Sequence, residues 1–268
     1  MGKYTRGQSA VPRGTCPSCT ATGNGDLRFC TKCGYKLIGN TQQLTRSSRS
    51  SVQAIAVIFA GVLVTLILSS WLSPDPPGSN ARFIGEALAM SMGFVVFGAI
   101  GVKLLGKGAL EQSFAGPCTP RDFGLGLLAG ALSLAIGLAY VWALIWLLRD
   151  GEAPAASELF REPPFVPSLF AVLLVSAVFP ALVEEWLNRG VLWIALSRIT
   201  RPPIVIFCTA VVFAFMHGLN GGGPFELPHR FVGGLLLGWV RHKTGSLVPV
   251  VAGHGLLNSL AIALETYG

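Results

Sequence analysis

Ionisable residues inside apolar stretches are the feature of this chain best suited to chemistry. Glu184 and Glu185 lie midway through an apolar run at 168–198, and Arg189 follows Glu185 by one helical turn. A charge at the depth of a bilayer costs at least about 2.5–3.5 kcal/mol on insertion scales, so such residues are paired, protonated or functional. Arg189 is near enough along a helix to neutralise one carboxylate. The pattern is compatible with a free titrating glutamate and with a purely structural salt bridge.

Two histidines and an asparagine occupy later apolar runs. His217 ends the stretch Phe213-Ala-Phe-Met-His217, and Asn258 follows His254 by one turn, so that both can share one helix face. If these runs converge on the glutamates, they combine a carboxylate base, imidazoles able to hold a water or a metal, and an amide donor for an oxyanion. We therefore expect a catalytic centre within the membrane.

The ordered motifs EExxxR, FxxxH and HxxxN on successive membrane helices resemble the CAAX-protease and bacteriocin-processing (CPBP) family, which includes prenyl-protein endopeptidases. The resemblance covers about residues 168–265. It implies an intramembrane endopeptidase, a hydrolase with a CAAX-protease-like core. The residues that match the motifs are Glu184, Glu185, Arg189, Phe213, His217, His254 and Asn258.

The resemblance also implies a role for each matching residue. Glu184 would be the general base for an attacking water that His217 helps to position. His254 and Asn258 would stabilise the oxyanion, and the division of work between the two glutamates stays open. The family is often described as metalloproteases, but the His-Glu-x-x-His signature is absent, so two histidines and a glutamate could hold either a zinc ion or a water. The residues expected to orient the site are Glu185, Arg189 and Phe213.

A cysteine cluster near the N-terminus predicts a second kind of site. Two CxxC pairs in a short polar segment have the spacing of a tetrahedral zinc site, so we expect a small zinc ribbon in residues 1–36. Its zinc would be structural, and its role would be docking to a protein partner or regulation. Residues 37–51 are expected to be a flexible basic linker. The predicted zinc ligands are Cys16, Cys19, Cys30 and Cys33.

Composition determines the class of protein that must position these residues. Of the 268 residues, 51% are hydrophobic and only 12% are charged, whereas about a quarter are charged in an ordinary soluble domain. This excludes a soluble enzyme, a disordered chain and a secreted disulfide scaffold. We expect an all-α, polytopic bundle over residues 52–268. The seven expected spans lie at about 52–72, 83–105, 123–148, 168–198, 203–219, 230–242 and 246–265.

Charge is unevenly distributed along the chain. Residues 1–51 contain eight basic residues and one acidic residue, which accounts for the whole net charge of +7. A basic arm before a membrane span sets topology or contacts anionic lipid more often than it binds nucleic acid, so no nucleic-acid partner is expected. Alternate loops obey the positive-inside rule, with an acidic loop at 149–166, and this predicts a cytoplasmic N-terminus.

The expected function is therefore cleavage of a peptide or protein substrate that reaches the bundle from the membrane. Two rival functions share the same residues. One is a non-catalytic scaffold or a bacteriocin self-immunity protein built on the same core, and the other is a transporter that relays protons through Glu184 and Glu185. An asparagine donor favours the protease, and the absence of an internal repeat disfavours the transporter.

Overall fold

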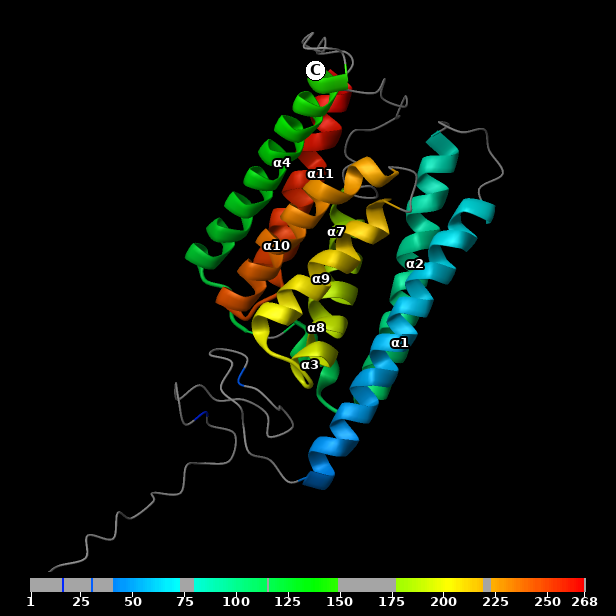
Figure 1. The fold of residues 1–268 in the computed structure, drawn as a ribbon, viewed down its shortest axis with the longest axis vertical. Helices are drawn as coiled ribbons and strands as arrows, with labels where there is room; N and C mark the ends of the chain where they lie inside the picture. Colours follow the sequence, from blue (N-terminus) through cyan, green and yellow to red (C-terminus); the bar gives the residue numbers. More distant parts are fainter. Residues whose placement is uncertain are drawn as a thin grey trace, which may run out of the picture.

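The protein is an all-helical bundle in the computed structural model, which describes residues 16, 30, 41–72, 80–114, 116–148, 177–218 and 223–267. No strand occurs in these ranges. Helices α1 (Thr41–Leu72) and α2 (Asn80–Leu105) form an antiparallel pair at one side, and α4 (Pro120–Leu148) and α11 (Val248–Tyr267) lie at the other (Figure 1). The central helices are α7 (Phe179–Glu185), α8 (Trp193–Ser197), α9 (Pro202–His217) and α10 (Leu227–Thr244).

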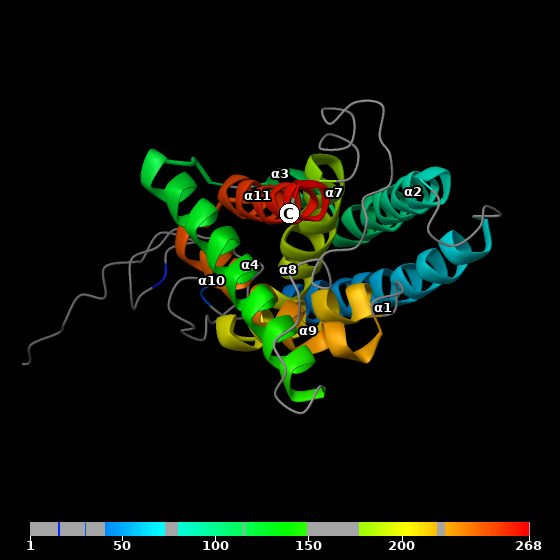
Figure 2. The same ribbon diagram turned by 90° about the horizontal axis from the view of Figure 1, so that it is seen from above.

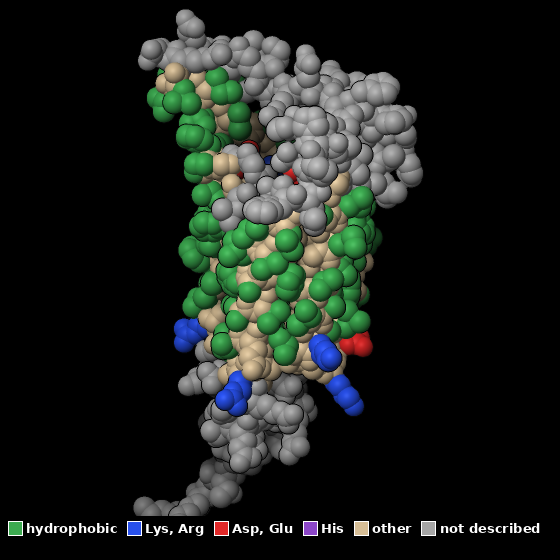
Figure 3. Space-filling view, turned by 90° about the vertical axis from the view of Figure 1, so that its right-hand side faces the viewer, with side chains coloured by type: hydrophobic (Ala, Val, Ile, Leu, Met, Phe, Trp, Pro, Cys, Tyr) green, Lys and Arg blue, Asp and Glu red, His purple; other side chains and the backbone are tan. Residues whose placement is uncertain are grey.

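Several helices have the length and apolar composition of membrane spans. Within the described ranges, three stretches are long and apolar enough to cross a bilayer: Ser47–Ser69, Gly85–Leu105 and Pro120–Leu148. Pro202–His217 and Val248–Leu264 are shorter apolar helices. Hydrophobic side chains cover the middle of the face seen in Figure 3, as expected for a surface in contact with lipid. The chain is thus an integral membrane helix bundle, although residues 168–176 of the fourth expected span lie outside the described residues.

The predicted linker requires a correction. Helix α1 begins at Thr41, so residues 41–51 continue the first span as helix instead of forming a flexible segment. This stretch contains no glycine or proline, and a helix that has already formed extends at little cost. The polar composition suggested a linker, but it does not prevent a helix from propagating outward from the apolar span.

The predicted zinc ribbon lies mostly outside the described residues. Cys16 and Cys30 are described, and both are buried. Cys19 and Cys33 fall outside the described ranges. The four-cysteine zinc site therefore stays a prediction.

The helix that carries the two glutamates is not a regular α-helix. After α7 the chain forms a π-helical segment, η2 (Trp186–Leu192), before α8 resumes α-helical geometry. Wide turns of this kind are rare, occur mostly inside α-helices and are frequent at functional sites. A short helix, α3 (Ala109–Phe114), lies in what the sequence predicted to be a loop at 106–122. Viewed from above, α7 and α8 lie between α2 and the pair of α4 and α11 (Figure 2).

Glycines allow α4 and α11 to pack closely. A Cβ atom on Gly126 would overlap the carbonyl oxygen of Pro249, and one on Gly130 would overlap the carbonyl oxygen of Gly253. Small residues permit such backbone approach between membrane helices, where no hydrophobic force drives association. This packing holds α11, and with it His254, against the rest of the bundle.

Candidate active site

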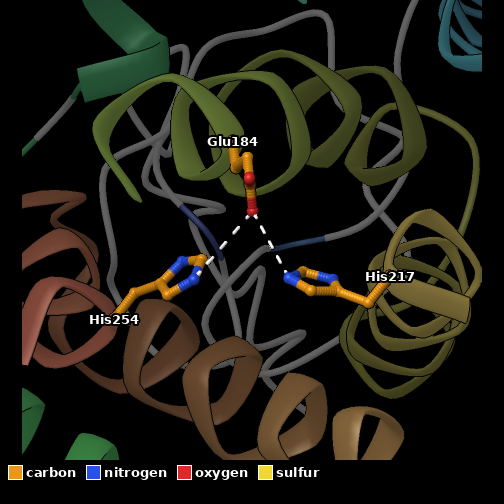
Figure 4. Close-up of side chains that lie close together, drawn as sticks. All are labelled: Glu184, His217 and His254. Atoms are coloured by element: carbon orange, nitrogen blue, oxygen red, sulfur yellow. Dashed lines mark ion pairs between the residues drawn. The ribbon is translucent and has the colours of Figure 1, made fainter. Parts of the chain in front are cut away.

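Three helices bring one ionisable side chain each to a common point. Glu184 lies at the end of α7, His217 is the last residue of α9, and His254 lies in the second turn of α11. Figure 4 shows the three side chains pointing toward one another. The Oε2 atom of Glu184 is 3.8 Å from Nε2 of His217 and 3.9 Å from Nε2 of His254. One residue from each of the three motifs thus lies at this point.

The hydrogen bond at Nδ1 determines which nitrogen of His217 carries a proton. Nδ1 of His217 lies 2.9 Å from the carbonyl oxygen of Phe213, one turn earlier on α9. A carbonyl oxygen can only accept, so Nδ1 donates. Nε2 of the neutral ring then carries a lone pair and faces Glu184. The FxxxH spacing matters because it places an acceptor one turn before the histidine.

A carboxylate performs the same task for His254. Nδ1 of His254 lies 2.8 Å from Oε1 of Glu185, and both side chains are fully buried. The same Oε1 accepts a hydrogen bond of 2.8 Å from Nη1 of Arg189. A carboxylate oxygen that already accepts from Arg189 can only accept from His254 as well, so a neutral His254 donates through Nδ1 and its Nε2 atom faces Glu184 with a lone pair. A carboxylate that fixes a histidine in this way is typical of metal sites and catalytic sites.

Three acceptor atoms therefore face one another. One ligand atom from each of Glu184, His217 and His254 lies within 4.8 Å of the other two. Among the described residues, Oε2 of Glu184 and Nε2 of His254 have no hydrogen-bond partner although both are buried. Buried lone pairs of this kind require a cation or a hydrogen donor between them. The donor set, two imidazoles and one carboxylate, fits a divalent metal such as zinc and fits a water equally well.

Arg189 links the glutamates to the neighbouring helices. Its Nη2 atom donates to the carbonyl oxygen of Gly234 on α10 at 3.1 Å, and its guanidinium lies 4.4 Å from the centre of the Phe213 ring. The Phe213 ring in turn packs against both histidines, with ring centroids 4.5 Å from His217 and 5.3 Å from His254. Arg189 and Phe213 thus contact the residues that they were expected to orient.

Asn258 lies near this group. Within the described residues it makes no hydrogen bond to Glu184, His217 or His254. It lies one turn after His254 on α11, and its amide nitrogen donates to the carbonyl oxygen of Ala177 at 3.4 Å. Ala177 precedes Glu184 on the same helical segment. An amide NH₂ has two protons, so Asn258 can donate the second one to another acceptor.

A polar cluster at the start of α10 was not predicted from the sequence. Oε2 of Glu226 lies 2.9 Å from Nε of Arg230 and 3.3 Å from Nε2 of His229. The hydrogen bond from His229 and the pair with Arg230 outweigh partial burial and lower the pKa of Glu226 to about 2. The charge of Arg230 also acts on Glu184 and His217, so this cluster lies beside the three acceptors. The i, i+3 and i, i+4 spacings could have suggested these pairs.

The comparisons with known proteins agree with this geometry. Residues 166–260 match the family model described as type II CAAX prenyl endopeptidase Rce1-like. No curated protein and no solved structure matches the chain significantly. The matched region contains the two glutamates, Arg189, both histidines and Asn258. Residues 166–260 of this integral membrane protein are thus similar to the Rce1-like proteases, and this match supports a relation to the CPBP family.

Proposed function

We propose that the protein is an intramembrane endopeptidase in which Glu184 activates the water that attacks a peptide bond. The observation that carries this proposal is the convergence of three lone-pair atoms, from Glu184, His217 and His254, at one buried point. A water placed among them can donate its two protons to two of these atoms while a lone pair on its oxygen faces a substrate carbonyl. The match of residues 166–260 to a family of endopeptidases supports the same reaction class.

The reaction needs one proton transfer in each direction. Glu184 takes a proton from the water as its oxygen bonds to the carbonyl carbon, which gives a tetrahedral oxyanion. The carbon–nitrogen bond then breaks, and the proton passes from Glu184 to the leaving nitrogen, so that the products are a carboxylic acid and an amine. The second amide proton of Asn258 is the donor that we assign to the oxyanion. Glu185 holds His254 in the tautomer whose Nε2 accepts a hydrogen bond from the water.

The same residues would hold a metal ion if one is bound. Glu184, His217 and His254 would supply the ligands, and the ion would polarise the substrate carbonyl and lower the pKa of a bound water. The carbonyl oxygen of Phe213 and the carboxylate of Glu185 would then orient the two imidazoles through their Nδ1 protons. In either arrangement Arg189 holds the carboxylate of Glu185 in place.

A test of the proposal compares Glu184→Gln with the wild type, purified in detergent, on matched fluorogenic peptides with and without a prenyl group. Losing a general base typically lowers the rate about 10²–10⁴-fold, and we expect a loss of that size. Glu86→Gln on α2 makes the same chemical change on another membrane helix, outside the site, and serves as the control. A folded Glu184→Gln protein that cleaves as fast as the wild type would refute the proposal and favour a scaffold.

Metal content separates the two forms of the mechanism. Zinc bound by the predicted ribbon would be the same in every variant, so only a difference in zinc content between variants reports on the candidate site. If His217→Ala contains one zinc ion fewer per chain than the wild type, a metal is bound at the site. Equal zinc contents together with lost activity would assign a water held by the protein alone.

A further inference from the structure

The exposed basic side chains of the bundle gather at one end. Figure 3 shows Lys and Arg at the lower end of the described surface, and the exposed residues of this kind include Lys103, Lys107, Arg121, Arg201 and Lys243. Contacts join the elements that carry them. Arg198 donates to the carbonyl oxygen of Leu105 at 2.8 Å, which joins the ends of α8 and α2. We name this the basic end.

Further contacts place the start of α11 and the end of α10 at the basic end. Arg241 donates to the carbonyl oxygen of Ser113 on α3 at 3.3 Å, and the amide of Leu247 donates to the carbonyl oxygen of Phe114 at 3.4 Å. The acidic residues nearby are Glu111 on α3 and Asp122 in the first turn of α4, fewer than the basic residues that surround them. The basic end is therefore a local excess of positive charge.

The mouth of the candidate site lies at the opposite end. Helix α9 starts beside Arg201, at the basic end, and finishes at His217. Helix α10 starts beside Glu226 and finishes with Arg241, His242 and Lys243 at the basic end. The side chains of His217 and Glu226 are 21% and 29% exposed, whereas Glu185 and His254 are fully buried. The water-exposed side chains of the site thus lie toward the end away from the basic residues, and Figure 3 shows a few charged atoms toward that end.

The residue types near the end of α4 also distinguish the far end of the bundle from the basic end. The exposed Trp142 and Trp146 lie in the last turns of α4, away from Arg121, where tryptophans are common at a membrane interface. The stretch 149–166 that follows α4 in sequence contains Asp150, Glu152, Glu158 and Glu162 against two arginines. Cytoplasmic ends of membrane proteins are rich in Lys and Arg, so the basic end has the composition of the cytoplasmic side.

We infer that the site opens toward the non-cytoplasmic side of the membrane, and that its substrates are peptide segments exposed on, or exported to, that side. The inference rests on the proposed function for its substrates, but the side of the opening follows from the charges and the direction of the helices. Thiolates of a zinc ribbon need a reducing compartment, so the predicted cysteine site agrees with a cytoplasmic N-terminus. A substrate tail confined to the cytoplasm would meet the basic end of the bundle and not the mouth.

The side of the mouth can be measured without enzymatic activity. Phe225→Cys places a thiol at a residue that is 61% exposed, immediately before Glu226, and Lys107→Cys places one at the exposed turn after α2. Both variants of the full chain are expressed in a bacterial membrane and treated with a membrane-impermeant maleimide in intact spheroplasts and in inverted vesicles. Peptide mass spectrometry separates the new thiol from the native cysteines, and labelling in detergent shows that each thiol can react.

We expect Phe225→Cys to be labelled in spheroplasts and not in inverted vesicles, and Lys107→Cys to show the reverse. The opposite pattern would overturn the inference. Labelling of both thiols from one side, or of Phe225→Cys only in detergent, would also overturn it, because the mouth would not then face the far aqueous phase.

A substrate measurement separates this inference from the proposed function. An impermeant peptide that detergent-purified enzyme cleaves is added to sealed spheroplasts and to sealed inverted vesicles. Cleavage in spheroplasts alone is expected, and cleavage in inverted vesicles alone would refute the inference while leaving the endopeptidase intact. Absence of cleavage in detergent, with the expected labelling, would refute the proposed function and leave the side of the opening established.

Discussion

Two buried arginine-containing clusters in this bundle differ in what their polar atoms contact. Arg241 is 4% exposed, and its guanidinium donates to main-chain carbonyl oxygens. These acceptors belong to Gln112, Ser113, Arg189 and Gly245. Arg189 is also buried, but it pairs with Glu185, which pairs with His254, which faces Glu184. The hydrogen bonds of Arg241 lead to backbone carbonyls. Those of Arg189 lead, through Glu185 and His254, to two atoms without a hydrogen-bond partner among the described residues, Oε2 of Glu184 and Nε2 of His254.

The difference separates a structural cluster from a candidate catalytic one. Buried polar groups are nearly always hydrogen-bonded in native proteins, and each exception needs an explanation. Arg241 ties α3, η2 and the end of α10 together through main-chain carbonyls. Oε2 of Glu184 and Nε2 of His254 are exceptions of the informative kind, because they face each other and His217.

The largest effect on stability is expected when one partner of the Glu185–Arg189 salt bridge is removed. Arg189→Met leaves the Glu185 carboxylate buried without its cation, and the loss of one partner of a buried pair costs about 3–5 kcal/mol. The double variant Glu185→Gln/Arg189→Met removes both charges and should recover much of the apparent Tm measured in detergent. It should not recover activity, because His254 loses its carboxylate acceptor. A double variant no more stable than Arg189→Met would show that the charge balance is not what Arg189 provides.

Arg241→Met tests the structural cluster. We expect a loss of about 2–3 kcal/mol of stability, since several buried carbonyls lose a charged donor. The turnover rate per folded molecule should change far less than in Glu184→Gln. Arg201→Met, at an exposed position of the same end, is the control and should change stability by about 0.5 kcal/mol or less. A fall in turnover as large as that of Glu184→Gln, with an unchanged Tm, would erase the distinction between the clusters.

The α4–α11 contact tests how the site is supported from outside both clusters. Gly130→Ala introduces a methyl group against the carbonyl oxygen of Gly253, one residue before His254, and overpacking of this kind costs about 1–3 kcal/mol. Gly124→Ala, also on α4, meets no atom within 4 Å and is the matched control. Thermal unfolding in detergent measures both. Equal Tm values for the two variants would mean that α11 shifts without cost.

Glu226 gives the smallest expected effect, and one that depends on pH. Its pKa is lowered to about 2 in the folded protein, so its ion pairs contribute stability above its ordinary pKa of 4.5, and this contribution is lost as the pH falls through 2. The side chain is partly exposed, so the contribution is about 1 kcal/mol or less. The Tm difference between wild type and Glu226→Gln should be constant above pH 5 and shrink toward pH 2. A difference that grows on acidification would contradict the sign.

Much of the site followed from spacing along single helices. Glu185 and Arg189 are four residues apart, as are Phe213 and His217, and a helix places such residues on one face whatever surrounds it. The apolar runs predicted the helical bundle. The predicted start of the first helix was wrong, because composition shows where a helix is apolar and not where it begins. The order of the three motifs along the chain carried the resemblance to a known family.

The amino-acid sequence by itself therefore determined the apolar helices, the residues with catalytic chemistry and the pairs within one helical turn. Only the tertiary structure decided that His254 shares the carboxylate of Glu185, 69 residues away, that Glu184 faces both histidines, and that Arg241 ends on the backbone of α3. The physical reason is reach. Helical periodicity relates residues up to four positions apart, whereas contacts between helices depend on crossing angles and on close approaches such as that of Gly130 to Gly253.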